Sequence, residues 1–127
     1  MPGRAKDWFL QAERDLEQAR ASAADGRHEW ACFAAQQAAE KAVKAVHLSK
    51  GQEAWGHMVA SLLKELPEGA PEELVDKARV LDNFYIGTRD PGSHPEGSPF
   101  EHYGEIQSGN AIRHANDILE FARLQMA

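Results

Sequence analysis

Small residues recur on several sides of the helix that residues 28–49 predict. Seven alanines cover much of its circumference: Ala31, Ala34, Ala35, Ala38, Ala39, Ala42 and Ala45. Because alanine lets neighbouring helices approach closely, we expect this helix to lie at the centre of a helical assembly. Glu40 and Lys44 are spaced to pair along its surface, and Gly51 is expected to end it.

Apolar residues spaced three and four apart predict two further long helices and a short one. The first covers residues 5–24 and stops at Asp25-Gly26, the short one covers residues 57–66, and the next runs from Pro71 to about Gly87. Their apolar positions are Trp8, Ala12, Leu16, Ala19 and Ala23, then Met58, Leu62 and Leu66, then Leu74, Ala78, Leu81 and Tyr85.

A capping signal predicts where the last helix begins. Ser98 is expected at the N-cap, Pro99 at the first helical position and Glu101 three residues after the cap. The helix is expected to reach the end of the chain with Ile106, Ala111, Ala115, Ile118, Ala122 and Met126 on its apolar side.

These elements predict an all-α fold, an up-and-down bundle of four long helices plus one short helix. We expect residues 1–127 to form one domain, since this length suits a single core. The chain lacks the apolar segment of a signal peptide and any run long enough to span a bilayer, so we expect a cytoplasmic protein without a membrane partner. Its net charge of −6 disfavours sequence-blind binding to nucleic acid.

The histidines, cysteine and tryptophans offer no strong metal or cofactor signal. No His-Glu-x-x-His or Glu-x-x-His pattern is present, so we expect no metal and no cofactor, and histidines on the surface or at helix ends. Cys32 is expected to be a small buried residue, and Trp8 and Trp30 to pack in the core, whereas the position of Trp55 in a loop leaves its role open. The histidines are His28, His47, His57, His94, His102 and His114.

The segment from Leu81 to His94 carries the strongest candidate chemistry. Arg89 and His94 follow a predicted helix that bears Asp82 and Tyr85. An arginine can hold a phosphate and a histidine can transfer protons near neutral pH, so the pair could cleave RNA without a metal, with the 2′-hydroxyl as nucleophile. The alternative is that Arg89 binds carbonyl groups at the helix end and His94 is a solvated loop residue.

Several motifs in order make the chain resemble the HEPN family (higher eukaryotes and prokaryotes nucleotide-binding). The first helix has Trp8, Ala12, Asp15-Leu16 and Ala19. The second contains Gln37-Ala38-Ala39-Glu40-Lys41-Ala42-Val43-Lys44-Ala45, similar to the family's Q-A-x-E-K-x-x-K-A core. His57 with Leu62-Leu63, and Leu81-Asp82 with Tyr85-Ile86 and Thr88-Arg89, resemble its later segments.

The resemblance implies a dimerising helical bundle that often pairs with a minimal nucleotidyltransferase in a toxin–antitoxin system. Many members are metal-independent endoribonucleases with an Arg-x4–6-His motif and a polar residue after the arginine. Arg89, Asp90 and His94 fit this pattern, with the two copies facing each other across the dimer. Asp82, Tyr85, Arg89 and Asp90 are therefore the candidate ligand-binding residues, and Arg89 and His94 the candidate catalytic ones.

The chain departs from the family pattern in three places. Asp90 stands where many short relatives have tyrosine, and Glu96 stands where some toxins have a tyrosine that the transferase modifies. Active ribonucleases usually hold the motif in a helical setting, whereas residues 87–99, with three prolines and three glycines, predict an irregular loop.

Three functions remain open on the sequence. The first is a homodimeric module that binds a nucleotidyltransferase and a nucleotide as part of a toxin–antitoxin-like pair. The second is a metal-independent endoribonuclease toxin that uses Arg89 and His94 on RNA, and the third is a structural helical dimer without a ligand.

Overall fold

The structure, a computed structural model, describes residues 3–127. Its regular elements are all helical in this range, and this confirms the expected all-α bundle with four long helices. They are α1 (Arg4–Ala24), α2 (His28–Ser49), α3 (Val59–Lys64), α4 (Glu72–Asp82), α5 (Phe84–Gly87), the short 3₁₀ turns η1 (Pro91–Ser93) and η2 (Pro99–Glu101), and α6 (Glu105–Met126). None of these helices is long and apolar enough to cross a lipid bilayer.

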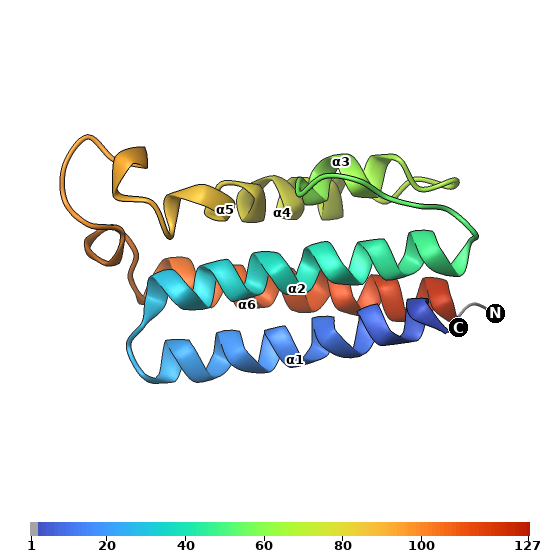
Figure 1. The fold of residues 1–127 in the computed structure, drawn as a ribbon, viewed down its shortest axis with the longest axis horizontal. Helices are drawn as coiled ribbons and strands as arrows, with labels where there is room; N and C mark the ends of the chain where they lie inside the picture. Colours follow the sequence, from blue (N-terminus) through green and yellow to red (C-terminus); the bar gives the residue numbers. More distant parts are fainter. Residues whose placement is uncertain (1–2) are drawn as a thin grey trace.

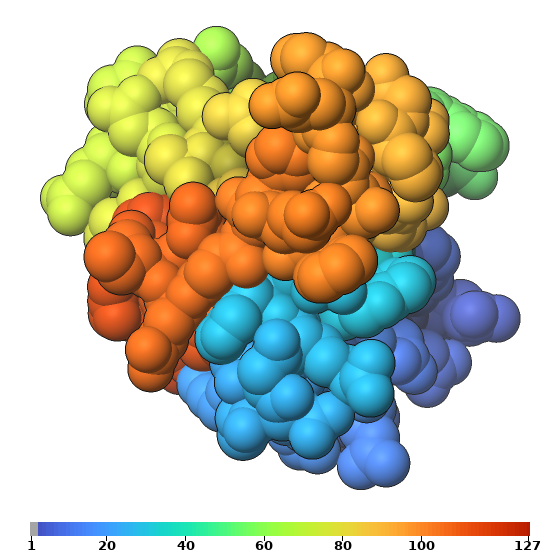
Figure 2. All heavy atoms as spheres, turned by 90° about the vertical axis from the view of Figure 1, so that its left-hand side faces the viewer, coloured from blue at the N-terminus to red at the C-terminus, as the bar shows by residue number. Residues whose placement is uncertain are grey.

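The alanine-rich helix α2 lies at the centre, as predicted. Figure 1 shows α2 between α1 on one side and the line of α3, α4 and α5 on the other, with α6 packed behind it. The start of α1 and the end of α6 lie at one end of the bundle. Figure 2 faces the opposite end, where the segment between α5 and α6 lies beside the start of α2.

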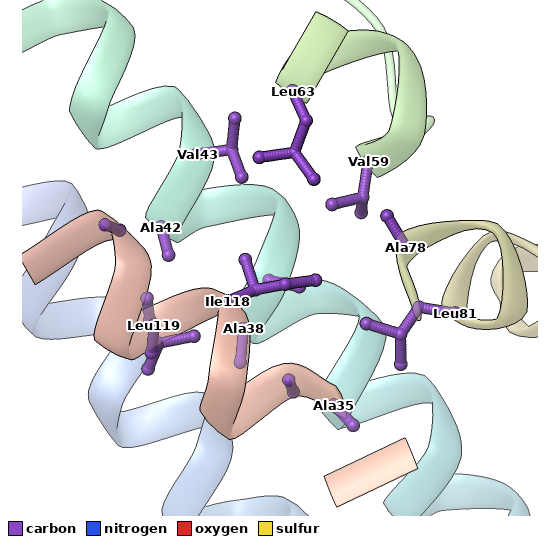
Figure 3. Close-up of a cluster of buried hydrophobic side chains, with 14 of the residues drawn as sticks. Ala35, Ala38, Ala42, Val43, Val59, Leu63, Ala78, Leu81, Ile118 and Leu119 are labelled. Atoms are coloured by element: carbon purple, nitrogen blue, oxygen red, sulfur yellow. The ribbon is translucent and has the colours of Figure 1, made fainter. Parts of the chain in front are cut away.

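The core forms where α2 meets α6 and the shorter helices. Figure 3 shows Ala35, Ala38 and Ala42 of α2 next to Ile118 and Leu119 of α6, and all five are buried. On its other side α2 presents Val43 towards the region of Leu63, Val59 and Ala78. The small side chains of α2 thus let α6 pack closely against it, while the larger residues of its partners fill the space between helices.

The short helix α3 is two residues shorter at each end than the predicted 57–66, and two other boundaries differ more. The helix expected to reach Gly87 ends at Asp82, and Phe84–Gly87 forms the separate short helix α5. The capping box at Ser98 is present, but it begins only the 3₁₀ turn η2. Gly104 then adopts an extended conformation, with φ −127° and ψ −170°, so α6 begins at Glu105.

Some side chains differ in burial from the prediction. Trp30 is 48% exposed because its side of α2 is not covered by another helix, and Ile106 is 78% exposed because it lies in the first turn of α6, at the open end of the bundle. His47 lies in the last turn of α2, one of the helix ends expected for the histidines, but its side chain is buried, where Nε2 donates to the carbonyl oxygen of Leu62 at 2.9 Å. Trp8 is only partly buried, with the Lys44 ammonium 5.8 Å from its ring centroid.

Candidate functional site

The carboxylate of Asp82 holds the start of α3. Its Oδ1 accepts a hydrogen bond of 2.6 Å from the backbone N–H of Val59, and Oδ2 accepts one of 3.1 Å from Ala60. Desolvation raises the pKa of Asp82, while these two hydrogen bonds lower it and nearby Glu40 raises it further; the net shift is upward. The structure therefore gives this candidate ligand-binding residue a capping contact within the fold.

Tyr85 of α5 and Arg89, two residues beyond the end of that helix, project from the same side, because Thr88 keeps a helical backbone and residues four apart share a helix face. Nε of Arg89 donates to the backbone oxygen of Tyr85 at 3.0 Å, and Nη2 donates to the same oxygen. The contact with a helix-end carbonyl, considered as an alternative from the sequence, is thus confirmed. The guanidinium carbon lies 4.2 Å from the ring centroid of Phe33 and 5.0 Å from that of Tyr85.

This arrangement fixes the Arg89 guanidinium and leaves part of it free. Arg89 is exposed and forms no ion pair with a carboxylate within residues 3–127. An arginine has five N–H donors, and the Tyr85 carbonyl uses only those of Nε and one of Nη2. The remaining donors can bind a carboxylate or phosphate oxygen.

Asp90 caps the 3₁₀ turn that comes next along the chain. Its Oδ1 accepts a hydrogen bond of 2.9 Å from the backbone N–H of Gly92, and its carbonyl oxygen accepts one of 2.6 Å from the Ser93 hydroxyl. These contacts shape the backbone between Arg89 and His94. The motif is therefore held by a turn, in agreement with the irregular segment expected from its prolines and glycines.

His94 is a half-buried, ordered side chain and not the solvated residue of the alternative interpretation. Its Nε2 donates to the carbonyl oxygen of Gly87 at 2.6 Å, because a carbonyl can only accept. The His102 ring stacks on it at 4.2 Å between centroids, and the Tyr103 ring meets it edge-on at 6.0 Å. In the neutral imidazole this leaves Nδ1 as the unprotonated nitrogen.

Within one chain, His94 lies on the far side of α5 from Arg89. A Cβ placed on Gly87 would lie 3.9 Å from His94 Nε2. Successive residues of a helix are rotated by about 100°, so the side of Gly87 is nearly opposite to the side that carries Tyr85 and Arg89. The two candidate catalytic residues thus face different surroundings.

Glu40 and His57 join the Tyr85 side of this region, and the sequence analysis did not select them. His57 Nδ1 donates to Glu40 Oε2 at 3.2 Å, and the His57 ring stacks on Tyr85 at 4.6 Å with an angle of 16°. The sequence analysis placed Glu40 in a pair with Lys44 and both Glu40 and His57 in motifs that resemble the family, but nothing in it joined the two residues. They lie 17 residues apart, beyond the reach of local spacing.

Cys32 and the possible metal ligands are the other candidates for chemistry. Burial raises the pKa of the Cys32 thiol to about 12, aided by the charge of Glu29. This agrees with the expected small buried residue. Within the described part of the chain, no three His, Cys, Asp or Glu side chains gather closely enough to hold a metal ion.

A hollow of about 450 Å³ adjoins the Arg89 region between α1 and α2. Phe33, which carries the Arg89 guanidinium on its ring, also lines this hollow together with Trp30. The other lining residues are mostly polar: Asp15, Gln18, Ser22, Arg27, Ala34, Gln37 and Lys41. This volume is within the range of small-molecule sites.

Comparison with known proteins identifies the family of the chain. The sequence pattern of the HEPN domain family matches residues 5–125. The chain is 47% identical to the protein TT1696 from Thermus thermophilus, with a TM-score of 0.95 over 97% of this chain and 98% of that one.

Two further crystal structures carry the family name. The archaeal HEPN homologue ST0689 is 39% identical, with a TM-score of 0.85 over 97% of this chain and 98% of that chain. A HEPN domain protein from Thermotoga maritima is 39% identical, with a TM-score of 0.75 over 92% and 94%. No curated protein sequence matches the chain. The match along nearly its whole length shows that the chain belongs to the HEPN domain family.

Proposed function

We propose that the chain is a homodimeric HEPN module that binds a minimal nucleotidyltransferase and a nucleotide, as one half of a toxin–antitoxin-like pair. The observation that carries this proposal is the exposed Arg89 guanidinium, fixed on the Tyr85 carbonyl and the Phe33 ring without a carboxylate partner in the described residues. A fixed cation with free donors is suited to an anionic ligand or partner surface.

The surroundings of Arg89 support the same proposal. Trp30, 48% exposed, contacts Phe33 edge-on with 6.2 Å between ring centroids, and Met58 is exposed next to His57. Exposed aromatic, methionine and arginine side chains are enriched in protein interfaces. The hollow beside Phe33 offers space for the base or ribose of a nucleotide.

Measurements of the mass in solution and of complex formation test whether the chain dimerises and binds the transferase. Light scattering on the purified chain is expected to give the mass of two chains. Mixing it with the minimal nucleotidyltransferase encoded nearest to its gene is expected to give a complex on size exclusion. Arg89→Gln is expected to weaken that complex, whereas Arg14→Gln serves as a matched control, since exposed Arg14 pairs with Glu17 on α1. A monomer that forms no complex would contradict the proposal.

A second candidate function is metal-independent cleavage of RNA by Arg89 and His94. The fixed His94 ring favours it, because the hydrogen bond from Nε2 to Gly87 leaves Nδ1 able to accept a proton. RNA cleavage in EDTA by the wild type, Arg89→Ala and His94→Ala tests this function. Equal activity in all three proteins would exclude these residues as the site, whereas a stable dimer inert towards RNA, nucleotide and transferase would favour a structural role.

A further inference from the structure

We propose that His57, oriented by Glu40, and Arg89 together bind a phosphorylated ligand of nucleotide size beside Tyr85 of α5, which packs against Phe33 of α2. This inference takes its ligand class from the proposed function and adds a second binding group to it. Four contacts support it. Glu40 contacts His57, His57 contacts Tyr85, and Arg89 contacts both Tyr85 and Phe33.

Glu40 is a buried anion whose surroundings are built to hold it. It is 5% exposed, and Lys44 Nζ donates to its Oε2 at 3.0 Å. Gln36 Nε2 donates to Oε1 at 3.3 Å and Gln37 Nε2 at 3.4 Å. A buried carboxylate with this many donors keeps one position, so it can fix a group that binds to it.

His57 is the group that Glu40 fixes. The carboxylate accepts from Nδ1, so the neutral ring carries its proton on Nδ1 and presents Nε2 as a free acceptor; the protonated ring presents Nε2–H as a donor. The side chain is 53% exposed, and one ring face is covered by Tyr85. The ring is thus held in place from two directions while its free nitrogen remains available to a ligand.

Arg89 and His57 contact different residues of α2. Arg89 bridges Tyr85 and Phe33, whereas His57 bridges Tyr85 and Glu40. Both groups contact the ring of Tyr85: the guanidinium carbon of Arg89 lies 5.0 Å from its centroid and the centroid of the His57 ring lies 4.6 Å from it. The two groups are therefore near enough for one ligand of nucleotide size to contact both.

The ligand class is set by the chemistry of the two groups. Arg89 keeps free N–H donors for phosphate oxygens, and His57 can donate to a phosphate or accept from a hydroxyl. Within the described residues, Arg89 forms no ion pair with a carboxylate. Lys44 forms an ion pair with Glu40 and so compensates its charge. Free nucleotides and single-stranded RNA share these phosphate and hydroxyl groups.

Nuclear magnetic resonance of the ¹⁵N-labelled chain tests the site. The probes are inorganic pyrophosphate, ADP and a short single-stranded oligoribonucleotide. We expect saturable shifts of the His57 ring nitrogens and of the Arg89 Nε–H with at least one probe. Shifts with ADP or pyrophosphate identify a free nucleotide as the source, and shifts with the oligoribonucleotide alone identify RNA. Absence of a His57 shift with all three probes would overturn the proposal.

Variants separate the contribution of each residue. His57→Gln and Arg89→Gln are each expected to weaken binding by about tenfold, the loss of one hydrogen bond to a charged group. His114→Gln, a histidine on α6, is the matched control and is expected to bind as the wild type does. Binding by His57→Gln within about twofold of the wild type would refute the role of His57. That result would leave the dimer and transferase experiments above unaffected.

Glu40 is a positioning residue in this proposal, and its variant needs a readout other than stability. In the wild type the ¹⁵N spectrum of neutral His57 is expected to show the Nδ1–H tautomer. Glu40→Gln is expected to reduce that preference and to weaken ligand binding while the helical circular dichroism is retained. An unchanged His57 tautomer and unchanged affinity in a folded Glu40→Gln protein would show that Glu40 only stabilises the fold.

Discussion

The carboxylate of Asp82, at the end of α4, accepts a 2.6 Å hydrogen bond from the backbone N–H of Val59, at the start of α3. The second carboxylate oxygen accepts from Ala60 at 3.1 Å. A residue that the family resemblance placed among the candidate ligand-binding residues therefore joins two helices. Asp82 thereby caps the N-terminus of α3, whose own N-cap residue, Met58, forms no side-chain hydrogen bond.

Asp82→Ala is expected to lower the free energy of unfolding by about 1–2 kcal/mol, the usual cost of losing a helix N-cap, because two N–H groups lose their acceptor. Urea unfolding followed by circular dichroism measures the change. Asp76→Ala is the matched control on the same helix, since exposed Asp76 contacts only the exposed Arg79. A loss no larger than that of the control would show that the cap does not stabilise α3.

The stability contribution of Asp82 is expected to depend on pH. Its pKa is raised in the folded chain, chiefly by burial, so the folded state holds the proton more tightly than the unfolded state. Such a group stabilises the fold below its unfolded pKa of about 3.9, and this contribution is lost as the pH rises through the folded value. Asp82→Asn cannot titrate, so its stability relative to the wild type should rise as the pH increases from below the unfolded pKa of about 3.9 through the raised folded pKa.

Unfolding of both proteins at several pH values measures this difference directly. The amide replaces one acceptor by a donor, which adds an offset that does not change with pH. Asp76→Asn is the control for a titrating but exposed carboxyl. A relative stability of Asp82→Asn that falls as the pH rises would contradict the upward pKa shift.

Gly87 is required by the close approach of Tyr103. A Cβ at residue 87 would lie 2.6 Å from the Tyr103 hydroxyl, and that ring is held against Phe84 and His94. Gly87→Ala is therefore expected to cost about 1–3 kcal/mol through overpacking.

Tyr103→Phe removes the clashing oxygen, so Gly87→Ala should cost much less in that background. Alanine is itself a better helix former than glycine, so the change could even stabilise α5 there. A double-mutant cycle of unfolding free energies gives the coupling between the two positions. Equal costs of Gly87→Ala in both backgrounds would show that the hydroxyl is not the obstacle.

Local sequence signals predicted the parts of this molecule that depend on neighbours in the chain. The bounds of α2 agree with its alanine periodicity, and the capping box at Ser98 is formed as its pattern indicates. The continuation of the last helix from Ser98 was wrong, because Gly104 imposes an extended residue between the two turns. A capping signal identifies where a helical turn starts, but it does not determine how far the helix continues.

The candidate site shows why spacing alone was insufficient. Tyr85 and Arg89 share a face as their interval of four predicts, and the Arg89 contact with a helix-end carbonyl is local. The partner of Asp82 lies 23 residues away and that of His57 lies 17 residues away. These pairs form only when α3, α4 and α5 pack against α2, which no local pattern in one sequence reveals.

The opposite positions of Arg89 and His94 around α5 lead to a prediction about how a ribonuclease site would be assembled. One chain presents the two residues to different sides, so a joint site would take Arg89 from one protomer and His94 from its partner. Arg89→Ala and His94→Ala homodimers would then both be inactive. A mixed dimer of the two would contain one site with both native residues and one with neither.

Unfolding and refolding the two variants together is therefore expected to restore RNA cleavage in EDTA. Random pairing in a two-fold dimer makes about half of the dimers mixed, each with one of two sites intact, so about a quarter of the wild-type activity should return. Each variant refolded alone is the control and should stay inactive. If both variants are inactive alone and the mixture remains inactive although mixed dimers form, the two residues must act within one chain, which would require His94 to leave Gly87 and cross to the Arg89 side of α5.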